Sequence, residues 1–128
     1  MLGSPHTLVR THTVHAQANR VFELRIYHTV QGRLPALQAT FRDQTLPLFK
    51  KHSITSIGYW VPQDAPASAN TWIYLLAHPS RDEAKKNWAA FQADPEWQAA
   101  FKAAQANGPM VESIDATFME QAETSPLK

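Results

Sequence analysis

Hydrophobic and polar positions alternate along residues 21–30, with the period of a β-strand. Glu23, Arg25 and Tyr27 fall on one face of this strand, and large apolar side chains fall on the other. β-Branched and aromatic residues are frequent in the segment, which also favours an extended backbone. The first regular element is therefore predicted to be a strand with two unlike faces.

Three more strands follow from the same kind of pattern. Residues 54–61 alternate, and Gly58 among them predicts a β-bulge or a close approach of another group to the backbone. Residues 71–77 are apolar on both faces, so this strand is predicted to lie inside its sheet. The short loop over residues 62–70 makes these two strands antiparallel neighbours. Residues 110–119 alternate and form the fourth predicted strand.

A first amphipathic helix is predicted between the first two strands. Its apolar residues run from Leu34 to Leu48 at spacings of three, four and seven. Pro47 has no backbone N–H, so we expect either a kink or a restart of the helix with Thr45 as its cap. The element is predicted to end at His52.

A second helical region begins at Ser80, which forms a capping box with Glu83. Asp94 and Pro95 are a cap and a first-turn proline, so a new helix is expected to start there. Four aromatic residues recur at helical spacing in this region, and they are predicted to pack in the core: Trp88, Phe91, Trp97 and Phe101.

The element order is strand, helix, strand, strand, helix, strand. This order is the split β-α-β-β-α-β pattern of the ferredoxin-like fold, an α+β class with an antiparallel sheet. Helices are expected to cover one sheet face. The other face is predicted to carry Arg25, Tyr27 and one side of the third strand. Because a half-apolar open face usually needs a partner, we predict a two-fold homodimer, sheet against sheet, forming a dimeric α+β barrel.

Composition narrows the function classes. The chain has 128 residues, enough for one domain, which we place at residues 21–119 between a flexible N-terminal tail over 1–20 and a C-terminal tail over 120–128. It contains no cysteine, which excludes disulfides and thiolate metal sites. The formal net charge is +1, and 44% of the residues are hydrophobic. Neither nucleic acid nor membrane insertion is expected as a result.

The N-terminal segment contains no acidic residue, but it also lacks the apolar run that a secretory signal requires. Secretion is therefore not expected. The predicted location is cytoplasmic, or organellar if the source is eukaryotic.

Five residues form the sharpest candidate site for a ligand. They combine one cation with aromatic rings and an imidazole, which suits a planar, largely apolar ligand bearing a carboxylate or carbonyl. The alternative is structural: the rings are core, and Arg25 pairs with Glu23, Asp115 or an acid of a second copy. The candidate pocket residues are Arg25, Tyr27, His52, Trp60 and Tyr74.

Histidines raise the question of a metal or haem. His28 and His78 end two predicted strands and could be joined by Asp115 or Glu112, but no metal-binding spacing is present. His52 or His78 could ligate haem, with no further haem signal in the chain. The four glycines form no phosphate-binding motif. We expect neither a metal nor a cofactor.

Several segments resemble one protein family in order and in spacing. They are Phe22–Tyr27, Leu46–His52, Gly58–Trp60, Trp72–Leu76 and Trp88–Trp97. Across residues 21–119 the chain is similar to the NIPSNAP family. The resemblance implies a dimeric α+β barrel of ferredoxin-like subunits and says little about a reaction. The family usually has glycine where this chain has Ser53, so Ser53 must either avoid the left-handed conformation or adopt it at some cost.

Three functions remain open at this stage. The first is binding of a small, largely apolar ligand between sheet and helices. The second is a non-catalytic adaptor whose exposed Lys50-Lys51 and Lys85-Lys86 faces dock partners. The third is a cofactor-independent monooxygenase or isomerase, by analogy with related barrel families. A cavity of roughly 300 Å³ or more would favour the first over the second.

Overall fold

The computed structural model describes residues 20–127. The N-terminal tail predicted for residues 1–20 lies, except for its last residue, outside the described part of the chain. Four strands and four α-helices follow, with a π-helical turn (η1) and a 3-10 turn (η2) between them. The strands are β1 (Val21–Thr29), β2 (Thr55–Trp60), β3 (Thr71–His78) and β4 (Val111–Glu120), and the helical elements are α2 (Leu34–Thr40), η1 (Phe41–Thr45), α3 (Leu46–Lys51), η2 (Ala67–Ala69), α4 (Arg81–Ala93) and α5 (Pro95–Ala104).

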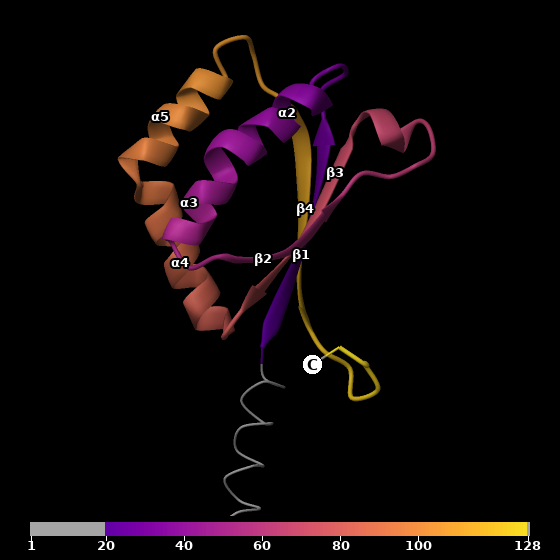
Figure 1. The fold of residues 1–128 in the computed structure, drawn as a ribbon, viewed down its shortest axis with the longest axis vertical. Helices are drawn as coiled ribbons and strands as arrows, with labels where there is room; N and C mark the ends of the chain where they lie inside the picture. The colour runs from indigo at the N-terminus through magenta and orange to yellow at the C-terminus, as the bar shows by residue number, and fades with distance from the viewer. Residues whose placement is uncertain (1–19, 128) are drawn as a thin grey trace, which may run out of the picture.

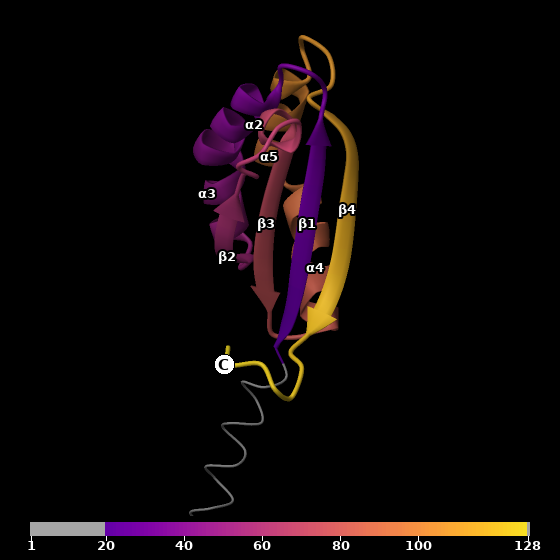
Figure 2. The ribbon, with the colours of Figure 1, turned by 90° about the vertical axis from the view of Figure 1, so that its right-hand side faces the viewer.

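The strands form one antiparallel sheet in the order β2-β3-β1-β4. The predicted order of elements and the ferredoxin-like topology are confirmed, and β3 lies inside the sheet as its two apolar faces required. Figure 1 shows the helices as one layer on one side of the sheet. Figure 2 shows the opposite sheet face, with no helix in front of β3, β1 and β4.

The two faces of β1 are placed the other way round from the prediction. Arg25 lies opposite Tyr74 of β3, and Tyr27 lies opposite Trp72. Directly opposed residues share a face, and both β3 side chains are buried with the helix residues of the core. Arg25 and Tyr27 therefore face the helices, and the prediction that they lie on the open face is wrong. Alternation separates two faces, but it does not say which face receives the helices.

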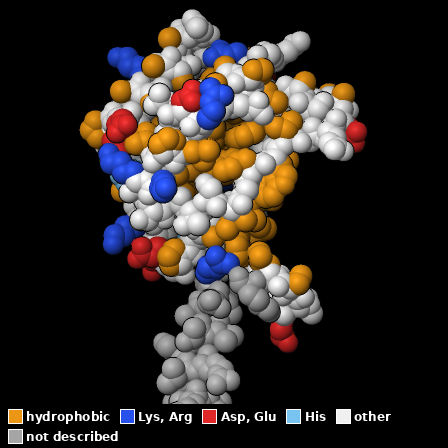
Figure 3. All heavy atoms as spheres, in the orientation of Figure 1, with side chains coloured by type: hydrophobic (Ala, Val, Ile, Leu, Met, Phe, Trp, Pro, Cys, Tyr) orange, Lys and Arg blue, Asp and Glu red, His pale blue; other side chains and the backbone are white. Residues whose placement is uncertain are grey.

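The open face is more apolar than predicted. Leu24 pairs with Leu75 and Ile26 with Ile73 across the two central strands. At the sheet edge, the side chain of Trp60 is 51% exposed. Figure 3 shows apolar side chains gathered over β2 and beside it.

Gly58 accounts for the position of that tryptophan. The sheet register shifts between Ser56 and Gly58, which is the predicted bulge. A Cβ at position 58 would lie 2.6 Å from Trp60 Cη2, so the indole rests against the glycine backbone. Both readings of this glycine, the bulge and the close approach, are confirmed.

Pro47 shapes the first helical region through a π-turn. The backbone N–H of Leu46 donates to the carbonyl of Phe41, five residues back, and α3 then starts with Pro47 in its first turn. A wider turn before a proline accommodates the missing N–H without breaking the helical path. The interruption expected at Pro47 is confirmed in the form of this π-turn, and the helical path continues through it. Thr45 is not the cap of α3, however, because its backbone is helical and its side chain makes no capping bond.

α3 ends in a left-handed residue. Ser53 has φ +61°, and the next residue, Ile54, donates its N–H to the carbonyl of Phe49 at 2.9 Å. A Schellman-like stop of this kind normally uses glycine, since a Cβ is disfavoured there. Of the two possibilities left by the sequence, Ser53 adopts the strained conformation.

We predict that Ser53→Gly stabilises the protein by about 0.5–1 kcal/mol, because relief of the left-handed strain exceeds the entropy lost with glycine. Thermal and urea unfolding measure the gain. Ser53→Ala is the matched control and should give none, because it keeps the Cβ. A glycine variant no more stable than the alanine variant would contradict this reading.

Candidate functional site

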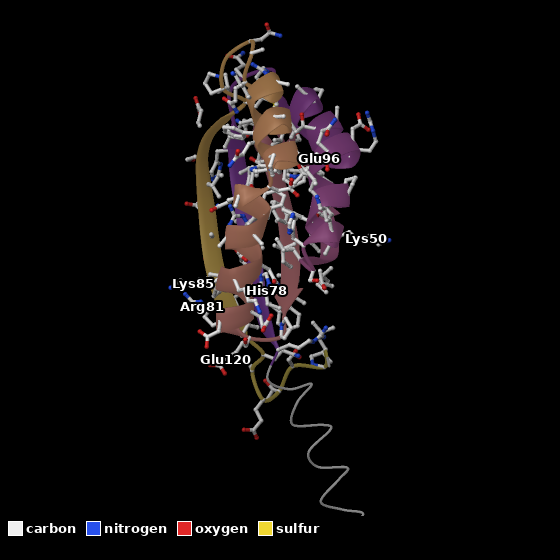
Figure 4. The ribbon with its side chains drawn as sticks, turned by 90° about the vertical axis from the view of Figure 1, so that its left-hand side faces the viewer. Lys50, His78, Arg81, Lys85, Glu96 and Glu120 are labelled. Atoms are coloured by element: carbon white, nitrogen blue, oxygen red, sulfur yellow. The ribbon has the colours of Figure 1, made fainter. Side chains whose placement is uncertain are left out.

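A cavity of about 630 Å³ lies between the helix layer and the sheet. Figure 4 looks onto the helix layer, where α4 and α5 lie beside α2 and α3. The cavity is bounded by these helices and by β1 and β4. Its walls are largely aromatic: Tyr27, Phe41, Phe49, Trp88, Phe91, Trp97 and Phe101.

The break between α4 and α5 places aromatic side chains on two walls. The hydroxyl of Ser80 accepts the N–H of Glu83 at 3.0 Å and starts α4, as predicted. Asp94 ends α4 and caps α5, accepting the N–H of Glu96 at 2.8 Å. Because the chain turns at Asp94, the side chains before and after it converge. The ring centres of Phe91 and Trp97 are 4.5 Å apart.

The prediction that the aromatic stripe packs in the core holds for Phe91, which is part of the core cluster, and for Trp88 and Trp97, which pack against it, but not for Phe101. All four of its residues line the cavity. Phe91 is buried, but Phe101 is 50% exposed. Helical spacing identifies the inward face of a helix, and it does not show whether that face meets another side chain or an open space.

The floor of the cavity is organised by the carboxylate of Glu23, which is 1% exposed. Its Oε1 accepts from His78 Nε2 and from Trp88 Nε1, each at 2.8 Å. Its Oε2 accepts from Arg25 Nη1 at 2.9 Å. Figure 4 shows His78 close behind α4, on the sheet beneath the helices. One carboxylate thus joins β1, β3 and α4.

Hydrogen bonding decides the charge of Glu23. Burial by itself would raise the pKa of this carboxyl, but the bonds from His78, Trp88 and Arg25 outweigh burial and lower the pKa below its usual value. Glu23 is therefore ionised at neutral pH. The structural alternative proposed for Arg25, pairing with Glu23, is what the structure contains.

Arg25 is held between rings. Its guanidinium lies 4.6 Å from the ring centre of Trp88 and 5.6 Å from that of Tyr27, in cation–π range. Burial opposes the charged form, but the nearby Tyr74 and Tyr27 and the bond to Glu23 raise the pKa of Arg25 above its usual value. It remains a cation, and it borders the cavity.

Tyr74 lies beneath Tyr27. Their hydroxyl oxygens are 2.8 Å apart, and Arg25 Nη2 donates to the Tyr27 oxygen over a longer 3.5 Å. Tyr74 has no exposed surface, and its ring stacks on Tyr59 with 5.1 Å between centres. Burial raises the pKa of Tyr74 well above its usual value and that of Tyr59 to about 12. Both phenols stay protonated at physiological pH.

Two of the five predicted site residues border the cavity, namely Arg25 and Tyr27, and Tyr74 supports them from below. His52 and Trp60 are not brought there. Trp60 lies on the other sheet face, because it is opposite Ile73 in the register of β2 and β3. His52, after α3, faces the α4–α5 turn instead.

His52 and its neighbour Lys51 hold that turn. His52 Nε2 lies 2.7 Å and Lys51 Nζ 2.8 Å from Oδ2 of Asp94. Asp94 therefore binds α3 while it caps α5. The contact of Asp94 with Lys51 and His52 is called the Asp94 clamp below. The sequence predicted the cap at Asp94 but not this clamp, because His52 and Asp94 are far apart along the chain.

Thr45 is a site residue that the sequence did not indicate. It is 3% exposed and borders the cavity, and its hydroxyl has no hydrogen-bond partner among the described residues. The π-turn directs it inward, and no sequence signal separates that turn from an ordinary helix. An unpaired buried hydroxyl is costly, and because this oxygen has almost no accessible surface, Thr45 borders the cavity through the rest of its side chain.

The two other histidines among residues 20–127, His28 and His78, have separate partners. His28 pairs with exposed Asp115 at 3.2 Å, and His78 pairs with Glu23. Within residues 20–127, no group of three potential ligands is arranged to hold a metal ion. In the same range, no helix has the length and apolar character needed to cross a bilayer.

The Asp94 clamp predicts how stability depends on pH. Bonds from Lys51, His52 and the Glu96 N–H hold the pKa of Asp94 well below its usual 3.8. A folded-state pKa below the unfolded value adds stability above the unfolded pKa and loses it as pH falls through the folded one. We expect the stability difference between the wild type and Asp94→Asn to be full at neutral pH and to shrink progressively below about pH 4.

Thermal unfolding of both proteins across that pH range measures this difference. Asp64→Asn, which removes an exposed carboxylate in the β2–β3 loop, is the control and should not reproduce the trend. A difference that stays constant from neutral to acidic pH would rule out the clamp as an ionic contact.

Comparison with known proteins finds one matching family and several structures of the same fold. The family model for NIPSNAP matches residues 22–126. A NIPSNAP family protein of unknown function from Agrobacterium tumefaciens is 24% identical, with 87% of this chain and 96% of that chain covered and a TM-score of 0.74. The comparison with curated proteins finds no match.

Two more distant structures share the fold. SnoaB, a cofactor-independent oxygenase from Streptomyces nogalater, is 12% identical, with 85% of this chain and 99% of that chain covered and a TM-score of 0.57. A dimeric protein of unknown function with a ferredoxin-like fold, from Bacteroides fragilis, is 19% identical, with 80% and 96% covered and a TM-score of 0.55. The family match spans nearly all of the described residues, so the chain belongs to the NIPSNAP family.

Proposed function

We propose that this NIPSNAP protein binds a small, largely apolar molecule in the cavity between its helices and its sheet. The observation that carries the proposal is the cavity itself. At about 630 Å³ it lies within the range of roughly 300–1,000 Å³ that small-molecule sites occupy. Docking of partners on the outer helix surface does not require a cavity beneath the helices, so the cavity favours ligand binding over the adaptor function.

The distribution of polar groups supports the same function. The walls are aromatic, and two polar residues of β1, Arg25 and Tyr27, also line the space. Ligand sites typically combine apolar walls with a few fixed polar groups that orient the bound molecule.

The proposal concerns binding rather than a reaction. SnoaB supports a cofactor-independent oxygenase only through a shared fold, and folds of this kind host many activities. The adaptor hypothesis relied on the lysine pairs of α3 and α4. Those lysines are exposed, which ordinary solvated helix surfaces also explain.

We also propose that the protein is a homodimer formed through its open sheet face. Support comes from the apolar pairs Leu24–Leu75 and Ile26–Ile73 on that face and from a dimeric structural neighbour. A stable dimer requires an interface of roughly 1,200 Å² or more in total, and a largely apolar sheet face suits such an interface.

Filling the cavity should prevent binding. We predict that 2-isopropylnaphthalene binds saturably and changes the emission of Trp88 and Trp97, which line the cavity. Ala104→Phe should weaken this binding about tenfold or more, because overpacking a filled site costs about 1–3 kcal/mol. Fluorescence titration measures both affinities.

Ala99→Phe is the matched control for this substitution. Ala99 lies on the same helix, α5, but is exposed and outside the cavity lining. The Ala99→Phe variant should bind 2-isopropylnaphthalene with the affinity of the wild type. No saturable binding to the wild type, or equal loss in both variants, would count against a ligand site here.

Charge on the open face should separate the subunits. We predict a dimer for the wild type and a folded monomer for Leu75→Arg, since an arginine in an apolar interface loses its hydration. Sedimentation velocity at micromolar concentration, with circular dichroism for folding, distinguishes the two. Ala90→Arg, on the exposed side of α4, controls for added charge. A monomeric wild type would refute the dimer.

A further inference from the structure

The hydroxyl groups of Tyr27 and Tyr74 have an assignable hydrogen-bond direction. The structure gives Tyr74 one partner among residues 20–127, the Tyr27 oxygen at 2.8 Å, and Tyr74 is fully buried. The Tyr74 hydrogen must therefore point to Tyr27, because a buried donor without a partner is costly. The Tyr27 oxygen then accepts from both Tyr74 and Arg25.

This direction leaves the hydrogen of Tyr27 free. A phenol oxygen has two acceptor sites and one hydrogen, and both acceptor sites are used. Tyr27 borders the cavity, so its O–H is available to a ligand there. Arg25, which also borders the cavity, has donors only. The polar end of the cavity floor thus offers donors, and the ligand atom that meets them must be an acceptor.

Charge balance then selects the kind of acceptor. Arg25 is the cation among the residues that line the cavity, and Glu23 already neutralises it at 2.9 Å. Glu23 is ionised, because its hydrogen bonds lower its pKa. The other charged lining residue is an acid, Glu112. A carboxylate ligand would become a second anion on a cation that is already paired, whereas a neutral carbonyl oxygen meets no such repulsion.

The walls select the rest of the molecule. The rings of Phe91 and Trp97 lie 4.5 Å apart in a tilted pair, and Trp97 and Phe101 continue this wall at 5.7 Å. The edge of Phe41 and the ring of Tyr27 lie across the floor, 5.8 Å between centres. Aromatic surfaces pack best against another flat ring, by offset stacking or edge-to-face contact.

We propose that the ligand class is a neutral, planar aromatic carbonyl compound, with its carbonyl oxygen on Tyr27 Oη–H beside Arg25 and its rings among the cavity aromatics. This inference rests on the proposed function and narrows it. It chooses the carbonyl over the carboxylate, which the sequence left equally open.

The test uses three probes of nearly equal shape on the full-length protein: 2-acetylnaphthalene, 2-naphthoate and 2-isopropylnaphthalene. At about pH 7.5 the naphthoate is ionised. Tryptophan fluorescence titration, checked by calorimetry, gives the affinities. We expect the ketone to bind about tenfold more tightly than the hydrocarbon and to exceed the carboxylate by more.

The outcomes separate the two levels of the proposal. If none of the probes binds, the proposed function fails. If the hydrocarbon binds and the ketone is no tighter, the cavity is a ligand site and the carbonyl inference fails. If the carboxylate is the tightest probe, the charge argument is overturned.

Two phenylalanine variants test the hydrogen-bond direction. Tyr27→Phe should reduce ketone affinity about tenfold and leave the hydrocarbon unchanged, because of the two probes only the ketone uses the Tyr27 hydroxyl. Tyr74→Phe is the matched control: the Tyr27 hydrogen stays available, so ketone affinity should change by less than about twofold. A clear gain in ketone affinity for Tyr74→Phe would mean that Tyr27 donates to Tyr74, which overturns the inference.

Discussion

The buried carboxylate of Glu23 is the interaction on which both the fold and the site depend. It receives hydrogen bonds from β3, through His78, from α4, through Trp88, and from Arg25 of its own strand. An unpaired carboxylate in this position would be strongly unfavourable. Its three donors therefore fix the height of α4 above the sheet and the direction of the Arg25 guanidinium at the same time.

Two polar anchors hold the helix layer, one in the middle of α4 and one at the α4–α5 turn. Glu23 holds the middle of α4 through Trp88, and Asp94 holds the α4–α5 turn to α3 through Lys51 and His52. Beyond that turn, α5 has no fully buried residue. Aromatic side chains of α5 border the cavity, so in this protein a hydrogen-bonded floor faces a less tightly packed wall.

Local rules predicted the elements well because the responsible groups are neighbours in sequence. The caps at Ser80 and Asp94, the bulge at Gly58 and the alternation in β1 each depend on a few adjacent residues. The π-turn before Pro47 marks the limit of these rules. A missing N–H predicts some interruption, but packing decides between a kink, a cap and a wider turn, and here it buried Thr45 beside the cavity.

The sequence by itself determined the ferredoxin-like topology, the interior position of β3 and the shared face of Arg25 and Tyr27 on β1, because periodicity and residue type encode them. Only the tertiary structure decided which sheet face received the helices, that Trp60 and His52 lie away from the cavity, and that Trp97 and Phe101 line a space. The physical reason is that these features depend on contacts between residues far apart in the chain. Glu23 of β1 binds Trp88 of α4, Asp94 binds residues at the end of α3, and the packing of the two layers sets the size of the cavity.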